Sequence, residues 1–255
     1  MAMLSIRNVT KRFGGLVAND NISFDVEQGA LFAVIGPNGA GKTTLFNMIS
    51  GFFAPTSGSV HFDGADITGR PQYQVSEGGL VRTYQLVQLF KDLTVAQNVM
   101  AGFHRVTRGG VASALFRPGW MRAQEKHIAD KTGELLDFVG LGGRGDMLAD
   151  KLPYGQQRLL EVARALAAEP KLLLLDEPAA GLNVQETAAL ADVIERVNQR
   201  GVTVLLVEHD MGLVMRVAQR IAVIDFGRKI AEGAPAEIKT HPDVLAAYLG
   251  GTEAA

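Results

Sequence analysis

A phosphate-binding pattern lies near the start of the chain. The residues Gly36-Pro37-Asn38-Gly39-Ala40-Gly41-Lys42-Thr43 match G-x-x-x-x-G-K-[ST]. Glycines let successive backbone N–H groups turn toward a phosphate, and the N-terminus of a following helix adds partial positive charge. We expect Lys42 to reach the β- and γ-phosphates of ATP and the Thr43 hydroxyl to ligate Mg²⁺. The candidate ATP-binding residues of this segment are Gly36, Pro37, Asn38, Gly39, Ala40, Gly41, Lys42, Thr43 and Thr44.

Two adjacent carboxylates, Asp176 and Glu177, follow the apolar run at residues 172–175. Ligands of open α/β sheets bind at the carboxyl ends of the strands. We therefore expect Asp176 to hold Mg²⁺, directly or through water, and Glu177 to orient or deprotonate the attacking water. The alternative is an ordinary acidic loop after a strand. The phosphate-binding pattern elsewhere in the chain favours the catalytic interpretation.

Two further segments have weaker individual signals. His209 follows the apolar run at residues 203–207, and a neutral histidine there could bond both the γ-phosphate and the attacking water. The alternative is a structural histidine at the end of a strand. Residues 152–156, Leu-Pro-Tyr-Gly-Gln, precede an amphipathic helix whose N-terminal N–H groups could bind a second phosphate. By itself this segment is only a turn before a helix.

The elements that must position these groups alternate between buried strands and helices, which predicts an α/β fold with a mostly parallel sheet. Polar–apolar alternation at residues 4–9 and 22–26 predicts an antiparallel N-terminal β portion, with a turn at residues 11–15 and another strand at 59–62. The buried strands are expected at 31–35, 171–175 and 203–207. Helices are expected at 44–50, 156–168, 185–199 and 235–248, and a hairpin at 221–232.

Strand signals disappear in the middle of the chain. Helices are predicted at residues 92–99 and 121–139, with a loop at 108–119 between them. We therefore expect a first part of the ATPase core at residues 1–86 and an inserted helical subdomain at 87–152. The second part of the core, with its C-terminal helix, is expected at 153–255.

Composition limits the class of protein. The chain has 255 residues and 47% hydrophobic residues, enough for a sizeable core. A net charge of -2 and the lack of a basic stripe argue against nucleic acid as a partner. There are no cysteines, so disulfides and thiolate metal sites are excluded. The N-terminal residues lack the apolar core of a signal peptide, and no apolar run approaches the length of a membrane span.

Taken together, these segments resemble the ATP-binding subunits of ABC transporters in order and spacing. The detailed sequence at residues 81–90, 154–167, 176–183 and 207–215 is similar to that of the ATP-binding subunits of branched-chain amino acid importers. The resemblance implies that Phe13 stacks on adenine and that Gln85 senses Mg²⁺ and contacts the membrane subunit. It also makes Glu177 the catalytic carboxylate and His209 the switch histidine, and it matches Asn183 to a position where the wider family usually has Asp.

The resemblance further implies a dimer of ATP-binding subunits in which each ATP lies between one subunit's phosphate loop and the other's signature motif. Residues 152–156 match that signature, so Gly155 and Gln156 would contact the partner's ATP. The signature usually opens Leu-Ser-Gly-Gly, whereas here Pro153 replaces the serine and Tyr154 the first glycine. Pro153 has neither a hydroxyl nor an N–H group, so the expected phosphate contact is altered.

These observations predict an ATP-hydrolysing importer subunit for branched-chain or other hydrophobic amino acids. It would act on the cytoplasmic face of the inner membrane, bound through transmembrane permease subunits, beside a second ATP-binding subunit that is a paralogue or a second copy. Alternatives within the class are a urea or amide importer and a lipopolysaccharide exporter. A soluble ABC ATPase acting on nucleic acid and a small-molecule kinase are alternatives from other classes.

Overall fold

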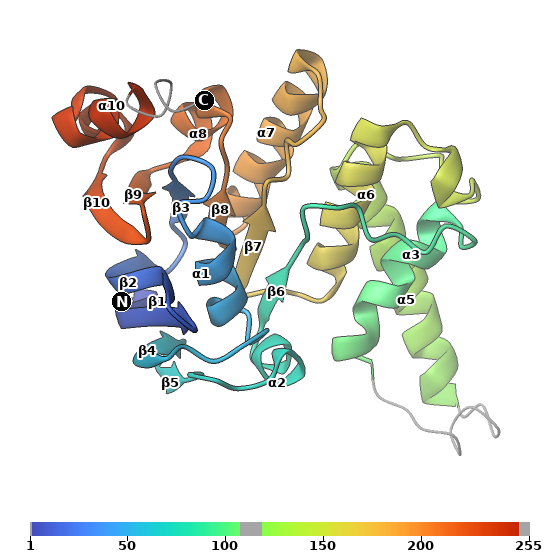
Figure 1. Cartoon of the computed structure of the whole chain (residues 1–255). Coiled ribbons are helices and arrows are strands. Elements are labelled where there is room, and N and C mark those ends of the chain that lie inside the picture. The colour runs from blue at the N-terminus through green and yellow to red at the C-terminus, as the bar shows by residue number, and fades with distance from the viewer. Residues whose placement is uncertain (1, 108–118, 250–255) are drawn as a thin grey trace. The chain divides into compact units, whose positions relative to one another are not determined.

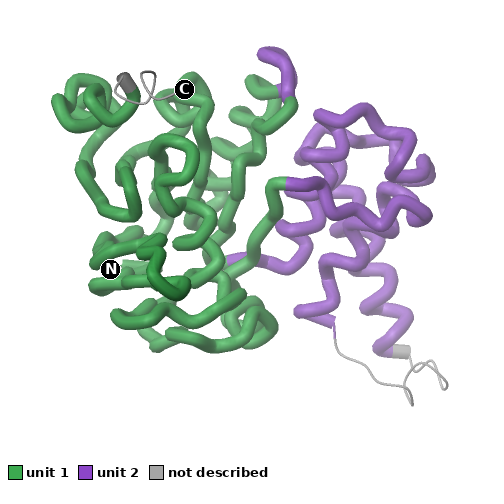
Figure 2. Tube along the Cα trace, viewed as in Figure 1, with its two compact units in different colours: residues 1–85, 171–181, 187–255 green, residues 86–170, 182–186 purple. Residues whose placement is uncertain are grey.

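The computed structural model describes residues 2–107 and 119–249. The chain divides into two compact units (Figure 2). Unit 1 comprises residues 1–85, 171–181 and 187–255, and unit 2 comprises residues 86–170 and 182–186. Within the described ranges, no helix has both the length and the apolar character that a bilayer crossing requires. The predicted loop at residues 108–119 lies almost entirely outside the described residues.

Unit 1 contains a four-stranded antiparallel sheet in the order β2-β1-β4-β5 (Figure 1). The strands are β1 (Ala2–Phe13), β2 (Leu16–Glu27), β4 (Ser57–Phe62) and β5 (Ala65–Asp66). The predicted antiparallel β portion is thus confirmed, with strands longer than the alternation indicated. The expected turn at residues 11–15 is shorter, because pairing continues as far as Phe13 and Leu16.

A six-stranded sheet, also in unit 1, has the order β10-β9-β3-β8-β7-β6. Neighbours from β9 through β6 are parallel, and only β10 is antiparallel to its neighbour β9. The strands are β3 (Leu31–Ile35), β6 (Leu80–Arg82), β7 (Leu172–Asp176), β8 (Thr203–Val207), β9 (Arg220–Asp225) and β10 (Arg228–Gly233). All residues of β3, β7 and β8 are buried, as expected for central parallel strands.

The core of unit 1 lies between the two sheets, around helix α1 (Lys42–Ile49) (Figure 1). Leu45, Phe46 and Ile49 of α1 pack in one cluster with residues of β1 and with alternate residues of β2, β3, β7 and β8. The cluster includes Leu172 and Leu174 of β7 but not Leu173 and Leu175, as the period of two in a strand requires. This packing holds the start of α1 against the ends of the central strands.

The other helices of unit 1 are α2 (Gln72–Glu77), most of α7 (Val184–Gln199), α8 (Met211–Val217), α9 (Pro235–Thr240) and α10 (Pro242–Leu249). The single helix predicted at residues 235–248 is therefore wrong. His241 has extended backbone angles, because the residue before a proline is disfavoured in the α conformation, and Pro242 starts a new helix. Helix α8 was not predicted, although Asp210 supplies a regular N-cap to Leu213.

The described part of unit 2 is helical and contains α3 (Val95–Gly102), α5 (Gly119–Phe138), α6 (Tyr154–Ala167) and the short helices η1 (Phe103–Arg105) and η2 (Ala149–Lys151). Helix α6 packs with α3 and α5. Because α6 packs with these helices, the compact unit extends to Pro170. The sequence had suggested a shorter subdomain at residues 87–152. Gly102 explains the close approach of α3 and α6, because an added Cβ would lie 2.2 Å from the Arg164 carbonyl oxygen.

Candidate functional site

The phosphate loop connects β3 to α1, and at two of its glycines, Gly36 and Gly41, any other residue would clash. Gly36 has a φ of 152° and Gly41 a φ of 98°. A Cβ at Gly36 would lie 1.9 Å from the Ile224 carbonyl oxygen, and one at Gly41 would lie 2.4 Å from that of Ala18. The loop is therefore pressed against β9 and β2, and its shape is set by the surrounding sheet.

Lys42 holds the loop together from inside. Its Nζ donates hydrogen bonds to the carbonyl oxygens of Gly36 at 2.7 Å and Pro37 at 2.9 Å. The side chain is buried, and desolvation lowers the pKa of Lys42 despite the opposing charges of Glu177, Asp176 and Glu208. Among the described residues this buried ammonium has carbonyl partners and no direct carboxylate partner, so it is well placed to receive an anion.

A cleft of about 840 Å³ opens in front of this loop. Ten of the predicted site residues line it: Asn38, Gly39, Ala40, Gly41, Lys42, Thr43, Thr44, Gln85, Glu177 and His209. Leu16, Val17, Ala18, Phe226 and Gly227 complete the lining. Its backbone N–H groups, hydroxyls and single ammonium at the N-terminus of α1 suit a polyphosphate.

Three of the predicted side chains meet at one end of this cleft. Gln85 Nε2 donates a hydrogen bond to Glu177 Oε2 at 2.8 Å, and His209 Nδ1 lies 3.8 Å from the same oxygen. Gln85 follows β6, Glu177 follows β7 and His209 follows β8, so the order of the parallel strands brings them together. A carboxylate flanked by an amide and an imidazole can orient a water and accept its proton.

Glu208, which the sequence did not single out, ties two strand-end loops together. Its side chain is fully buried, and Oε1 accepts a hydrogen bond from the Ala179 N–H at 2.7 Å. Oε2 accepts hydrogen bonds from the N–H groups of His209 at 2.9 Å and Asp210 at 3.1 Å. Glu208 is therefore a positioning residue for the loops that carry Glu177 and His209. The signal available in the sequence was an acidic residue directly after a buried strand.

Asp176 has a different environment from that of Glu177. Its Oδ2 pairs with Nη2 of Arg82 at 2.6 Å, and both side chains are buried. Nη1 of Arg82 also donates hydrogen bonds to Asn47 Oδ1 and Ser50 Oγ, both at 2.8 Å. Asp176 is not among the residues that line the cleft. Arg82 is a second structural residue that the sequence analysis missed.

Phe13 also lies outside the residues that line the cleft. Its ring is 47% exposed, packs edge-on against Phe53 at 5.5 Å and lies beneath the ammonium of Lys11. On the cleft itself, Leu16 and Phe226 expose apolar side chains, and Phe226 has a positive φ of 41° that bulky residues rarely adopt. Both are surfaces on which a planar base could stack.

The predicted signature residues lie in unit 2. Pro153 is the N-cap of α6 and makes no side-chain capping bond, while its carbonyl oxygen accepts hydrogen bonds from the N–H groups of Gln156 and Gln157. Gly155 is buried, and an added Cβ would lie 2.5 Å from Glu186 Oε1. Gln156 Oε1 accepts a hydrogen bond from Arg144. The start of α6 is therefore tightly packed.

The oxygen donors of the cleft suit a hard cation better than a transition metal. Thr43 and Gln85 line the cleft, whereas Asp176 is engaged by Arg82. Within the described ranges, no three histidine, aspartate or glutamate side chains cluster as a preformed metal site. Such a sparse donor set fits Mg²⁺, which usually keeps its waters and is bound through substrate phosphates with one or two protein groups.

Comparison with known proteins gives a consistent result. A family model described as "ABC transporter" matches residues 19–180. A second model, "Branched-chain amino acid ATP-binding cassette transporter", matches residues 228–254. The chain is 42% identical to BraF of Pseudomonas aeruginosa, a high-affinity branched-chain amino acid transport ATP-binding protein, over 97% of this chain and 98% of that protein.

Solved structures agree. The ADP conformation of MJ1267, an ATP-binding cassette of an ABC transporter, matches with a TM-score of 0.85 and 32% identity over 98% of this chain and 99% of that one. The ATP-binding cassette MJ0796, described as a dimer bound to ADP and phosphate, matches with a TM-score of 0.76 and 25% identity over 91% and 99%. By its family match, its near-complete coverage of a curated relative and its fold, the chain belongs to the ABC transporter family as an ATP-binding cassette.

Proposed function

We propose that this chain is the ATP-binding and ATP-hydrolysing subunit of an importer for branched-chain or other hydrophobic amino acids. The observation that carries the proposal is the meeting of Gln85, Glu177 and His209 at one end of a cleft that also contains a phosphate loop. The names of BraF and of the C-terminal family model support the class of solute. ATP-binding cassettes hydrolyse ATP to power transport.

In this proposal the phosphate loop binds the nucleotide. The N–H groups at the start of α1 and the ammonium of Lys42 hold the β- and γ-phosphates, while the carbonyl oxygens of Gly36 and Pro37 keep Lys42 directed into the loop. Phe13 stacks on the adenine after its ring has turned from the neighbouring Phe53. The exposure of this ring leaves it free to make that movement.

Mg²⁺, when bound, neutralises charge on the β- and γ-phosphates. Thr43 and Gln85 would hold it from the cleft. A contribution from Asp176 would come through a water, because Arg82 already engages one of its carboxylate oxygens.

Glu177 orients the attacking water and accepts its proton. Gln85 positions the Glu177 carboxylate through a hydrogen bond from its amide. His209, whose ring lies near the same carboxylate oxygen, binds the γ-phosphate. Lys42 and His209 stabilise the charge that develops on the transferred phosphoryl group. Glu208 keeps both loops in register by bonding their backbones.

The proposed assembly has two ATP-binding subunits, a paralogue or a second copy being the partner. Each ATP lies between one subunit's phosphate loop and the N-terminus of the other's α6, where Gly155 and Gln156 face it. The dimeric state described for MJ0796 supports an assembly of two ATP-binding subunits. Because Pro153 offers no hydroxyl, the contact at this start of α6 comes from backbone N–H groups alone.

The proposed location is the cytoplasmic face of the inner membrane, where the chain is held by transmembrane permease subunits. Leu86 and Phe90 in unit 2 are 73% and 54% exposed, and exposed apolar side chains of this size are typical of docking surfaces. We expect a short permease helix to bind there.

The test is co-purification of the tagged chain with membrane proteins from its own cells, followed by ATPase assays in liposomes. The expected result is ATP hydrolysis stimulated by leucine, isoleucine or valine together with the matching solute receptor. Hydrolysis stimulated only by urea or amides would replace the solute class while keeping the ATPase. Lack of hydrolysis by a folded, assembled complex would overturn the whole proposal.

A further inference from the structure

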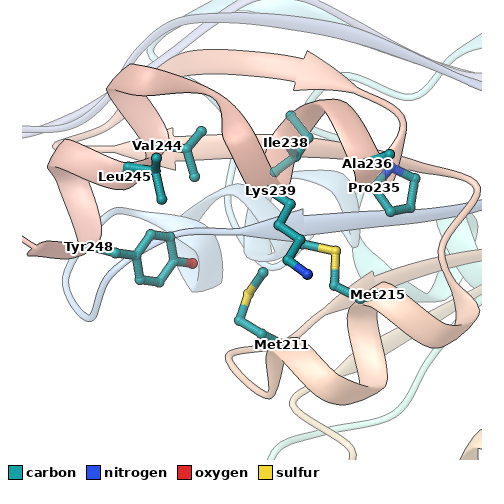
Figure 3. A pocket seen from close by; sticks show the side chains of 9 residues that line it. All are labelled: Met211, Met215, Pro235, Ala236, Ile238, Lys239, Val244, Leu245 and Tyr248. Atoms are coloured by element: carbon teal, nitrogen blue, oxygen red, sulfur yellow. The ribbon is translucent and has the colours of Figure 1, made fainter.

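A second concave site lies in unit 1, built only from the C-terminal helices (Figure 3). It has a volume of about 550 Å³ and shares no lining residue with the nucleotide cleft. We call it the C-terminal pocket. Helix α8 contributes Met211 and Met215, helix α9 contributes Pro235, Ala236, Ile238 and Lys239, and helix α10 contributes Val244, Leu245 and Tyr248.

The walls of the C-terminal pocket are apolar but not closed. Ile238 and Val244 are nearly fully buried and form its fixed part, whereas Leu245 is 47% exposed. Met211 and Met215 extend into it from the opposite helix (Figure 3). Methionine side chains are flexible and polarizable, and they often line surfaces that adapt to more than one ligand. The volume lies within the range of about 300–1,000 Å³ usual for small-molecule sites.

Two polar groups enter this apolar space. The Lys239 side chain extends between the two methionines, and the Tyr248 hydroxyl points toward the same interior (Figure 3). That hydroxyl is buried beside the backbone of Gly36, and its hydrogen has no acceptor among the described residues. Burial also raises the pKa of Tyr248, so the group is a neutral donor at neutral pH. A buried hydroxyl hydrogen without an acceptor is destabilising, and a ligand that supplies an acceptor would remove that cost.

Lys239 has the only cationic side chain among the residues that line the pocket. In the described part of the chain, no carboxylate forms an ion pair with its ammonium. Glu237, the nearest carboxylate on α9, instead accepts a hydrogen bond from the Ala234 N–H. The pocket therefore combines an apolar volume, one unpaired ammonium and one hydrogen-bond donor. This combination selects a ligand with one anionic end and an aliphatic body.

We propose that the C-terminal pocket is a binding site for a small aliphatic carboxylate. The carboxylate would pair with Lys239 Nζ and accept a hydrogen bond from Tyr248, and the aliphatic body would lie among Met211, Met215 and Ile238. A cationic ligand would meet the Lys239 charge, and a purely apolar one would leave both polar groups without partners.

The test uses the full chain with ¹³C-labelled methionine methyl groups, titrated with octanoate and followed by NMR. We expect saturable shifts at Met211 and Met215, with smaller or no shifts at the other methionines. Lys239→Gln should weaken octanoate binding by up to about fivefold, because Lys239 is exposed and an exposed ion pair contributes modestly to binding. Tyr248→Phe should weaken it by less. Lys126→Gln, at an exposed position in α5, is the matched control and should bind octanoate normally.

Two comparison ligands make the test decisive. Octylamine should not compete with octanoate, and octan-1-ol should bind with an affinity that Lys239→Gln does not change. The proposal is overturned if octanoate leaves both methionines unshifted at millimolar concentration. It is also overturned if Lys239→Gln keeps the wild-type affinity or if octylamine binds as tightly as octanoate. Because ATP binding is measured separately on the same samples, failure of this site would not affect the proposed ATPase.

Discussion

The guanidinium of Arg82 lies 2.6 Å from the carboxylate of Asp176, and both side chains are almost completely buried. Removal of one partner from such a pair leaves an uncompensated buried charge. Arg82→Met should therefore lower the free energy of unfolding by about 3–5 kcal/mol, measured by urea denaturation without nucleotide. Arg12→Met, at an exposed position of β1, is the control and should change it by less than about 0.5 kcal/mol. Equal stability of the two variants would contradict a structural role for the ion pair.

Glu177→Gln should retain ATP binding and lose turnover. The amide can still accept the hydrogen bond from Gln85 through its oxygen, but it cannot take a proton from water. We expect phosphate release to fall by about 100-fold or more, which is the usual contribution of a general base. Size-exclusion chromatography with ATP should then show an accumulated dimer. Glu27→Gln, at the end of β2, is the control. Near-normal turnover by Glu177→Gln would show that another group acts as the base.

ATP affinity should depend on pH through Lys42. Burial lowers the pKa of this ammonium in the free protein, and bound phosphates, being anionic, raise it again. Between those two pKa values binding requires uptake of a proton, so the affinity for ATP should fall as pH rises through that window. Calorimetry in buffers of different ionisation enthalpy measures this proton uptake. Lys42→Ala should abolish both the uptake and most of the affinity while the chain stays folded. Affinity without pH dependence in that window would refute the lowered pKa.

Pro153→Ser should strengthen ATP-driven dimerisation. Pro153 is an N-cap without a side-chain bond, and serine would cap α6 and offer a hydroxyl to the partner's ATP. We expect the ATP concentration for half-maximal dimerisation to fall by about tenfold or more, since a bond to a charged group contributes about 1.5–3 kcal/mol. Pro153→Ala removes the proline without adding a hydroxyl and separates the two effects. If serine and alanine behave alike, backbone groups alone provide the contact.

Phe90→Glu should release the permease while leaving ATP binding intact. The Phe90 ring is exposed and rests against the guanidinium of Arg164, and Asn98 holds its backbone through two hydrogen bonds. A carboxylate there would pair with Arg164 rather than present an apolar surface. Co-purification measures the loss, which should reach at least tenfold. Tyr73→Glu, at a similarly exposed aromatic of α2, is the control. Retained assembly in both variants would place the docking surface elsewhere.

The sequence was most informative where local chemistry determines structure. The phosphate loop could be predicted because its glycines and its lysine are adjacent, and the apolar runs at β3, β7 and β8 could be recognised because central parallel strands are buried on both faces. Strand order was not predictable in this way. It depends on which apolar faces pack together, and it is what brings Gln85 next to Glu177.

The missed features depend on partners far away in the chain. Arg82 pairs with Asp176 across neighbouring strands, so no local pattern distinguishes it from a surface arginine. Asn19 is similar, since its buried side chain donates to the Gly41 carbonyl oxygen at 3.2 Å. By contrast, the break before α10 had a local cause in Pro242 and could have been predicted.

Glu208 gives the cleft a property that neither strand-end loop has alone. Because its two carboxylate oxygens hold Ala179 on one side and His209 with Asp210 on the other, neither loop can shift without stretching bonds to the other. The loops that follow β7 and β8 are therefore mechanically coupled. A force applied at either loop, by a departing phosphate or by a partner subunit, would move both, and the cleft would open in a single step.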